Sequence, residues 1–299
     1  MTDQLNFHAW FLAARPRTLP AATVPVIVGS AIAYGNGKMH FWAALAALMA
    51  ALLIQIGTNF ANDVFDFKKG TDTWERTGPL RVTQAGLLTP HQVLAGTGLA
   101  FGLAMLIGLY LVFLGGWPIL LIGIFSILCG MAYTGGPYPL GYNGLGDLFV
   151  FIFFGLVAVG GTYYVQAGSL ETSALLAALP IGCLATAILV VNNLRDREND
   201  KKAGKRTLAV RLGERFTRWE YIYLLGFAYS VPLFIWLTGR ASFWILLPLL
   251  TLPLVPPLIR DIHVERGRPL NRTLAKTASL ELIYGFCYSL GYIVDRLFI

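Results

Sequence analysis

Long apolar runs, each of about 20 residues, recur along the whole chain and constrain its fold more than any other feature. An α-helix of that length crosses the hydrocarbon core of a bilayer, whereas a membrane β-barrel would show short alternating segments. Only 13% of the residues are charged, against about 25% in an ordinary soluble domain. The sequence therefore predicts an all-α integral membrane protein with nine spans: residues 18–36, 41–61, 92–114, 117–133, 147–167, 173–193, 219–238, 242–259 and 277–297.

Lysine and arginine are distributed unevenly between the two sides that these spans define. If residues 1–17 form a cytoplasmic segment, all of the 23 basic residues except Lys38, Arg240 and Arg296 fall on the cytoplasmic side. Positive charge concentrates on that side in membrane proteins. We therefore expect a multi-pass protein of the cell (inner or cytoplasmic) membrane, with its N-terminus inside and its C-terminus outside. The same bias accounts for the net charge of +7 without a nucleic-acid partner.

The first acidic cluster, NDVFDFKKGTD at residues 62–72, begins where the second span ends. If the helix continues, Asn62 and Asp66 are four residues apart and lie on one face. Asp63 comes three residues before Asp66, and Asp72, which lies beyond a glycine, is expected in the loop. The stretch thus brings amide and carboxylate oxygens to the end of a membrane helix.

A second cluster, NNLRDRENDKKAGKRTLAVRLG at residues 192–213, ends the sixth span on the same predicted side. Spacings of three and four place Asn193, Asp196 and Asp200 on one helical face. Each cluster therefore ends an even-numbered span, and the two spans are four apart. This pattern suggests a single domain over residues 1–299 with a weak internal repeat, in which spans 5–8 echo spans 1–4.

Two acidic clusters that face each other need cations between them. Mg²⁺ prefers oxygen ligands and is commonly held by a few carboxylates together with substrate phosphates. Basic groups then neutralise the remaining phosphate oxygens, so the pattern suits a Mg²⁺–diphosphate complex. The alternative is a set of helix-end charges solvated at the membrane interface, and the matching of the two clusters favours the metal site. The basic residues near the clusters are Lys68, Lys69, Arg76, Arg81, Arg195 and Arg197.

Two further stretches lie on the same predicted side as the clusters. ARPRTLPAATVPVIVGSAIA, residues 14–33, opens the first span, and its Arg15 and Arg17 either reach an anionic group or anchor the helix at the interface. YTGGPYPLGYNGLGD, residues 133–147, is too rich in Gly and Pro to continue a helix. Its tyrosines suggest an ordered loop over a site rather than a plain connector. The four histidines and three cysteines show no metal-type spacing.

The two clusters resemble the two aspartate-rich motifs of the UbiA superfamily of membrane prenyltransferases. Within it, RPRTLPAATVPVIVGSA, GPLRVTQAG, YTGGPYPLGYNGLGD and the second cluster together are similar to the MenA type. That type comprises the 1,4-dihydroxy-2-naphthoate polyprenyltransferases of menaquinone biosynthesis. The resemblance runs from about residue 15 to 215, and it implies nine helices around a central cavity capped by cytoplasmic loops.

The resemblance also implies a reaction. A Mg²⁺-bound polyprenyl diphosphate ionises to an allylic cation, the electron-rich ring of 1,4-dihydroxy-2-naphthoate attacks it, and CO₂ leaves to give demethylmenaquinone. Stabilisation of the leaving group by a metal and basic groups meets the main demand of ionisation. The lipid bilayer suits a long prenyl tail, because each CH₂ unit costs about 0.8 kcal/mol to keep in water.

Matching the motifs residue by residue implies roles for individual side chains. The implied catalytic residues are Asp66, Asp196, Asp200 and Tyr133. The implied metal ligands and their supporting residues are Asn62, Asp63, Asp66, Asp72, Asp196 and Asp200. The residues implied to bind the diphosphate are Lys68, Arg76, Arg81 and Arg195, and those implied to make other substrate contacts are Arg17 and Asn193. The gap between Asp66 and Asp72 is five residues, where many superfamily members have a shorter one, and this leaves the role of Asp72 open.

Two alternatives remain open from the sequence. The first is another acceptor in the same superfamily, namely homogentisate, 4-hydroxybenzoate, haem or chlorophyllide, although the loop 133–147 argues by resemblance against 4-hydroxybenzoate. The second is a membrane cation transporter, which would use carboxylates at mid-bilayer depth. Only Glu281 falls within the middle of a predicted span, so the enzyme is favoured. The prenyl chain length and the oligomeric state do not follow from the sequence.

Overall fold

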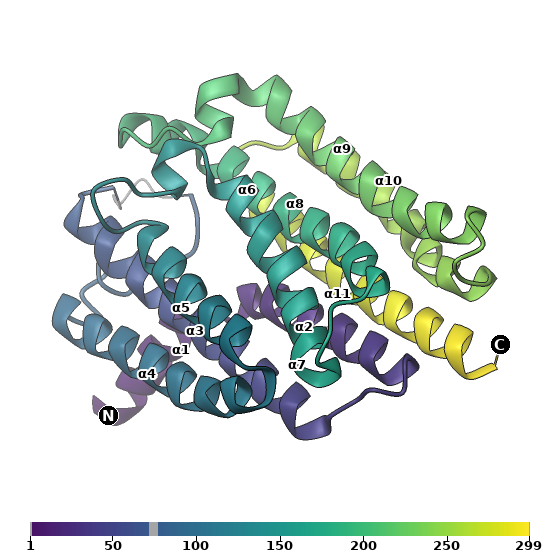
Figure 1. Cartoon of the computed structure of the whole chain (residues 1–299). Helices are drawn as coiled ribbons and strands as arrows, with labels where there is room; N and C mark the ends of the chain where they lie inside the picture. The colour runs from purple at the N-terminus through teal and green to yellow at the C-terminus, as the bar shows by residue number, and fades with distance from the viewer. Residues whose placement is uncertain (1, 72–76, 299) are drawn as a thin grey trace.

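The molecule is a bundle of helices that run roughly parallel or antiparallel to one another (Figure 1). The computed structural model describes residues 2–71 and 77–298, and no strand occurs in those residues. The predicted all-α fold is therefore confirmed. In chain order the elements are α1 (Thr2–Ala14), η1 (Pro16–Thr18), α2 (Leu19–Gly35), α3 (Phe41–Lys68), α4 (Pro90–Gly115), α5 (Trp117–Ala132), η2 (Gly141–Asn143), α6 (Gly146–Val150), the π-helix η3 (Phe151–Val157), α7 (Ala158–Ala167), α8 (Thr172–Lys202), α9 (Leu208–Leu237), the 3₁₀-helix η4 (Phe243–Leu254), α10 (Val255–Val264) and α11 (Leu270–Phe298).

Not every predicted span is long and apolar enough to count as a membrane crossing. Trp117–Ala132 is a shorter apolar helix, and α11 does not meet the criterion. Each of the nine predicted spans lies on a helical stretch, but the count of nine crossings stays a prediction. Seven stretches among the described residues do qualify: Phe7–Gly35, Phe41–Lys68, Pro90–Gly115, Gly146–Ala167, Thr172–Lys202, Leu208–Leu237 and Phe243–Val264.

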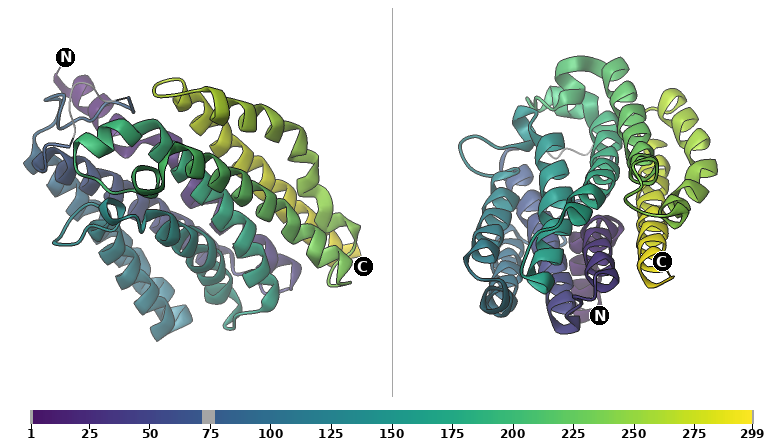
Figure 2. Two further views of the ribbon diagram at one scale, coloured as in Figure 1. Left: turned by 90° about the horizontal axis from the view of Figure 1, so that it is seen from above. Right: turned by 45° about the vertical axis from the view of Figure 1, so that its right-hand side comes forward.

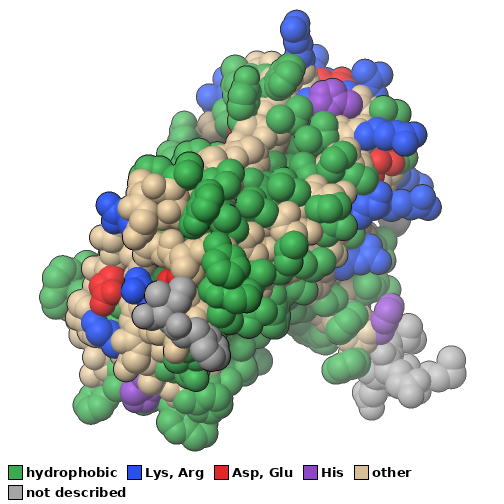
Figure 3. All heavy atoms as spheres, turned by 90° about the vertical axis from the view of Figure 1, so that its right-hand side faces the viewer, with side chains coloured by type: hydrophobic (Ala, Val, Ile, Leu, Met, Phe, Trp, Pro, Cys, Tyr) green, Lys and Arg blue, Asp and Glu red, His purple; other side chains and the backbone are tan. Residues whose placement is uncertain are grey.

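The exterior of the bundle is largely apolar. On the face shown in Figure 3, hydrophobic side chains form a broad band, while lysines and arginines crowd toward one end of it. Large apolar side chains point outward, and Phe113 and Leu237 are 85% and 74% exposed. Soluble monomers rarely expose apolar patches of this extent. The surface is that of a multi-pass membrane protein whose apolar band faces lipid.

Helix α8 runs through the bundle and contacts α2, α7, α9 and α11 (Figure 2). Its residues between Ala174 and Val191 are mostly buried, and they form the larger core together with α2, α9 and α11. Helices α3, α4 and α5 pack together on the other side of α2 and α7, around a smaller apolar cluster. The two groups of helices enclose a cavity, which is described below.

Helices α3 and α8 extend beyond the predicted spans that end at residues 61 and 193. The first continues to Lys68 and the second to Lys202, so Asn62, Asp63 and Asp66 of the first cluster and Asn193, Asp196 and Asp200 of the second are helical. Hydropathy marks only the part of a helix that suits hydrocarbon, while backbone hydrogen bonding continues into the polar interface. The helical spacing that the sequence analysis assumed within each cluster is therefore confirmed.

Helix α1 is not predicted, because residues 1–17 contain no long apolar run. It packs on α3 and α4 through a short apolar face. The ring of Trp10 meets Phe60 edge to face, with 5.4 Å between the ring centroids. This packing brings the end of α1, and the turn that follows it, against α3.

A close approach of α2 and α7 generates a stability prediction. A Cβ added to Gly29 would lie 2.6 Å from the carbonyl oxygen of Val159. Backbone atoms cannot move aside easily, so we expect Gly29→Ala to destabilise the fold by about 1–3 kcal/mol through overpacking. The measurement is the thermal unfolding midpoint of the purified protein in detergent.

Gly226→Ala is the matched control, because Gly226 is also helical and no atom beyond its chain neighbours and its own helix backbone lies within 4 Å of its added Cβ. Alanine favours the helix over glycine, so the midpoint of this variant should match or exceed that of the unsubstituted protein. Equal midpoints for the two variants would contradict the tight α2–α7 contact.

Candidate active site

A cavity of about 700 Å³ lies between helices α2, α3, α5, α7 and α8. Most of its lining is apolar, and the rings of Phe149, Phe153 and Phe154 contribute to it. Its acidic residues gather where α3 and α8 end, which is the same end of the bundle. The amides and carboxylates of the two clusters that line the cavity are Asn62, Asp66, Asn193, Asp196 and Asp200.

The two clusters sit on equivalent helix ends. At the end of α3, the N–H of Thr71 donates to the carbonyl of Asp66 (3.1 Å). At the end of α8, the N–H of Lys205 donates to the carbonyl of Asp200 (2.8 Å). Each bond closes a Schellman turn that contains a glycine with a φ of 66° or 75°, a conformation glycine adopts without steric cost. Asp66 and Asp200 therefore hold the same position relative to the ends of their helices.

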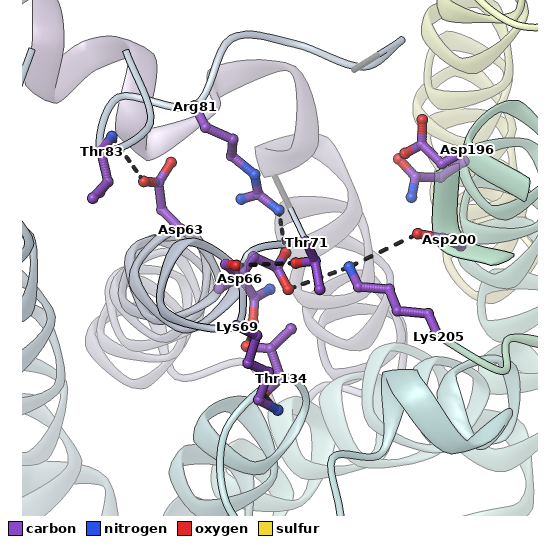
Figure 4. Close-up of polar contacts among 12 residues, drawn as sticks. Asp63, Asp66, Lys69, Thr71, Arg81, Thr83, Thr134, Asp196, Asp200 and Lys205 are labelled. Carbon is purple, nitrogen blue, oxygen red and sulfur yellow. Dashed lines mark hydrogen bonds and ion pairs between the residues drawn. The ribbon is translucent and has the colours of Figure 1, made fainter. Parts of the chain in front are cut away.

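The carboxylate of Asp66 is buried and has three polar partners. It accepts hydrogen bonds from Arg81 Nη2 (2.7 Å) and from the Tyr142 hydroxyl (2.7 Å). Lys205 Nζ forms an ion pair with its Oδ1 at 3.2 Å (Figure 4). A carboxylate removed from water is strongly unfavourable unless it is paired and hydrogen-bonded. These contacts compensate the burial of Asp66.

Lys205 connects the two clusters. Its ammonium group lies 3.2 Å from Asp66 Oδ1 and 3.9 Å from Asp200 Oδ1 (Figure 4). The ammonium groups of Lys205 and Lys69 also lie over the ring of Tyr142, at 4.7 and 4.4 Å from its centroid. A ring face attracts a cation. One lysine thus places a positive charge between the two clusters.

Asp196 is contacted by its neighbour in the chain, Arg195, and by Thr77. Arg195 Nε donates to Asp196 Oδ1 (2.9 Å), and Thr77 Oγ1 donates to the same oxygen (2.7 Å). Arg195 Nη1 reaches Asn271 of α11 (2.9 Å). The guanidinium of Arg195 is buried and ties α8 to α11, and its contact orients the Asp196 carboxylate.

The loop 133–147 covers this end of the cavity, as its composition suggests. The hydroxyl of Thr134 donates to Asn62 Oδ1 (2.7 Å), and Lys69 Nζ donates to the carbonyl of Thr134 (2.6 Å). Tyr133, at the start of the loop, lines the same cavity.

The structure brings most of the predicted site residues to the cavity. Lys68 is exposed at the end of α3, Arg195 is buried behind Asp196, and neither lines the cavity. Asp72 and Arg76 lie outside the described residues. The predicted site residues that do line the cavity are Arg17, Asn62, Asp66, Arg81, Tyr133, Asn193, Asp196 and Asp200.

Asp63 points away from the cavity toward the segment after α3 (Figure 4). Its carboxylate accepts hydrogen bonds from the backbone N–H groups of Val82 (3.3 Å) and Thr83 (3.0 Å), and it is 1% exposed. Asp63 thereby fixes the turn that carries Arg81, while its place among the metal ligands stays a prediction.

Two side chains at the site, Tyr142 and Lys205, go beyond the residues that the sequence assigned to it. Tyr142 belongs to the loop that the sequence singled out, but nothing distinguishes it there from the other tyrosines of the loop. Lys205 follows the glycine that ends α8, and in the sequence it counts only toward the charge bias. The sequence did offer one signal for Lys205: like Thr71, it directly follows the glycine that ends its helix.

The amide and carboxylate oxygens of the site are possible ligands for a metal ion. Among the described residues, no three His, Cys, Asp or Glu side chains form a group that could hold a metal ion by themselves. Asn62 and Asp66 on α3 nevertheless line the same cavity as Asp196 and Asp200 on α8. Mg²⁺ needs only one or two carboxylates when phosphates and waters complete its shell. These residues fit Mg²⁺ that binds together with a phosphate ligand.

Comparison with known sequences identifies close relatives over the whole chain. The model of the UbiA prenyltransferase family matches residues 22–280. A protein of Mycobacterium tuberculosis named 1,4-dihydroxy-2-naphthoate octaprenyltransferase is 39% identical, over 93% of this chain and 94% of its own length. A protein of the same name from Escherichia coli is 38% identical, over 99% of this chain and 99% of its own length. Another from Haemophilus influenzae is 36% identical, over 95% of this chain and 96% of its own length.

Solved structures share the fold at low sequence identity. A UbiA homolog from Aeropyrum pernix is 14% identical and superimposes with a TM-score of 0.70, over 94% of this chain and 97% of its own. A homolog from Archaeoglobus fulgidus, described as bound to DMAPP and Mg²⁺, is also 14% identical, with a TM-score of 0.61 over 94% and 99%. Together with the family match, these likenesses confirm the resemblance carried by the motifs: the chain belongs to the UbiA prenyltransferase family.

Proposed function

We propose that this chain transfers a polyprenyl group from a polyprenyl diphosphate to 1,4-dihydroxy-2-naphthoate, with loss of CO₂ and diphosphate, in menaquinone biosynthesis. Relatives named for this activity match nearly the whole chain. The structural observation that supports it best is an apolar cavity closed by two aspartate-bearing helix ends with Lys205 between them. Such a site accommodates an apolar tail and a diphosphate in one ligand.

Mg²⁺ is the metal we assign to this site, with Asn62, Asp66, Asp196 and Asp200 as the residues that hold it. When bound, the metal neutralises negative charge that develops on the diphosphate as the bond to the prenyl carbon breaks. The Archaeoglobus fulgidus homolog, which shares the fold, is described as bound to Mg²⁺ with DMAPP and with GPP. Asp63 is left out of the set because its oxygens accept backbone hydrogen bonds.

The basic side chains of the chain neutralise the rest of the diphosphate charge. Arg81 and Lys205 both line the cavity and both reach Asp66, so their positive charges lie beside the diphosphate position. Arg195 acts through Asp196, which it orients. Preorganised cations of this kind stabilise a leaving group without reorganisation during the reaction.

The aromatic wall of the cavity suits the prenyl group and the cation that it forms. Phe149, Phe153, Phe154 and Tyr133 line the cavity, where they exclude water and present ring faces to an allylic cation. The acceptor carbon that bears the carboxylate forms the new C–C bond. The bond to CO₂ then breaks and returns its electron pair to the ring. The direct product is the hydroquinone form of demethylmenaquinone, so no oxidant is needed.

The proposal includes a topology. Residues 1–299 form one domain with nine spans in the cytoplasmic membrane, with the N-terminus and the site inside and the C-terminus outside. The charge bias supports this orientation, and the loops after α3, α5 and α8 then cap the cavity on the cytoplasmic side. A cation transporter is not favoured, because Glu281 is buried in α11 apart from the residues that line the cavity.

Substitution of one aspartate from each helix end tests the function. We expect Asp66→Ala and Asp196→Ala to abolish prenyl transfer while the protein stays folded, although each removes an ion pair from a buried arginine and should lower the thermal unfolding midpoint. The assay contains purified protein, Mg²⁺, farnesyl or longer diphosphates, and 1,4-dihydroxy-2-naphthoate, and it follows CO₂ release. Homogentisate and 4-hydroxybenzoate serve as competing acceptors and should react poorly.

Glu198→Ala is the matched control, because Glu198 lies between Asp196 and Asp200 on the same helix but is 73% exposed. Its activity should match that of the unsubstituted protein. Near-normal turnover by either aspartate variant would contradict the assignment.

Metal removal gives a separate prediction. Treatment with EDTA should stop turnover, and added Mg²⁺ should restore it, because the carboxylates of the site bind diphosphate only through a cation. Full activity after exhaustive chelation would show that Lys205 and Arg81 suffice without a metal.

Tyr142→Phe tests the contact between the capping loop and Asp66. Loss of a hydrogen bond to a charged group costs about 1.5–3 kcal/mol, so we expect kcat to fall by roughly tenfold or more. Tyr138→Phe, in the same loop but 60% exposed, is the control and should leave kcat unchanged. Equal kcat for the two variants would exclude a role for the Tyr142 hydroxyl.

A further inference from the structure

The polar face of α3 continues from the acidic cluster deeper into the cavity. Gln55, Asn59, Asn62 and Asp66 follow at three- and four-residue spacing, and all four line the cavity. The first two also meet the turn before α2. Thr18 Oγ1 accepts hydrogen bonds from Asn59 Nδ2 (3.1 Å) and Gln55 Nε2 (3.4 Å). The cavity therefore has one polar wall next to the diphosphate position, although most of its lining is apolar.

Arg15 lies in the turn that meets this wall, and its backbone is left-handed, with φ 52° and ψ 66°. No other non-glycine residue in the described part of the chain has a positive φ. Crowding of the Cβ makes this conformation unfavourable for an arginine. Backbone strain of this kind persists only where the surroundings enforce it, and it concentrates at functional sites.

Hydrogen bonds enforce the conformation of the turn. The N–H and the hydroxyl of Thr18 both donate to the carbonyl of Arg15 (2.9 Å each). Asn59 Nδ2 donates to the carbonyl of Ala14 (3.0 Å), and Pro16 fixes the next φ. Glycine would fit this turn without strain. The arginine is therefore explained by its side chain and not by its backbone.

The side chain of Arg15 is partly buried and lines the cavity. Two other cavity cations, Arg81 and Lys205, both contact Asp66 at the diphosphate end. Arg17 also lines the cavity, but it is the more exposed of the two arginines of the turn. Arg15 thus adds a positive charge to the cavity lining from the turn that meets the polar face of α3, whereas Arg81 and Lys205 come from the connections that contact Asp66.

We propose that Arg15 binds the carboxylate of the aromatic acceptor and holds the acceptor against the polar face of α3. The inference rests on the proposed function, which supplies an acceptor with a carboxylate on its reacting carbon. A guanidinium pairs with a carboxylate through two parallel hydrogen bonds, which fix its orientation as well as its position. Holding that carboxylate places the reacting carbon beside the prenyl diphosphate. The contact ends when CO₂ leaves, so the product lacks this anchor.

The contact between Arg15 and the acceptor carboxylate can be tested with two acceptors that differ only in that carboxylate. The assay compares 1,4-dihydroxy-2-naphthoate with 1,4-dihydroxynaphthalene, each with farnesyl diphosphate and Mg²⁺. We expect the unsubstituted protein to favour the naphthoate. In Arg15→Gly and Arg15→Asn, the KM for the naphthoate should rise by about ten- to a hundredfold, the range for a hydrogen-bonded charged pair. The KM for farnesyl diphosphate, and the use of the naphthalene diol, should not change.

The two substitutions separate the charge from the backbone. Glycine and asparagine both tolerate a left-handed φ, so neither substitution adds backbone strain, and the thermal unfolding midpoints check that both variants stay folded. Stabilisation by the naphthoate alone, measured as a shift of that midpoint, should disappear in both variants. Arg15→Lys keeps a charge without the fork and should give an intermediate KM. Arg240→Gln, at the opposite end of the bundle, controls for loss of a positive charge.

Each outcome decides between the two claims. If both variants keep the preference for the naphthoate, or lose both acceptors equally, the role of Arg15 is refuted while the proposed function stands. If the unsubstituted protein does not use the naphthoate at all, both the function and the role of Arg15 are refuted.

Discussion

Asp66 is a charged group almost completely removed from solvent, at the end of a helix that runs through apolar surroundings. Its partners come from three connections that are far apart in the sequence: Arg81 after α3, Tyr142 after α5 and Lys205 after α8. Removal of one partner from a buried pair leaves charge uncompensated. The positions of these loops, and so the closed end of the cavity, depend on one another through this carboxylate.

The apolar runs predict the all-helical membrane fold because lipid exposure and buried packing both select apolar residues. Apolar runs do not predict helical segments that depend on packing or hydrogen bonding rather than on hydropathy. Helix α1 is short and mixed, and it is stabilised by contacts such as that of Trp10 with Phe60, a residue distant in the sequence. The polar ends of α3 and α8 stay helical beyond residues 61 and 193, because the backbone hydrogen bonds continue after the hydrocarbon ends.

Helical spacing predicts which amides and carboxylates of the two clusters share a face, and they do line one cavity. Spacing cannot separate Asp63 from its neighbours, because only the later turn at Val82 and Thr83 shows where its oxygens go. Arg15 and Arg17 flank one proline and look alike in the sequence. Their backbone angles and exposure distinguish them, and both arise from tertiary contacts that periodicity does not report.

The two Schellman turns have a consequence for ligand direction. Thr71 and Lys205 occupy the same step after their glycines, yet one is neutral and the other carries a charge that extends across the gap to Asp66. Two helix ends built alike are thereby made electrically unlike. At this step after the glycine only the α8 end contributes a positive charge, so the two ends do not present the same groups to a ligand between them.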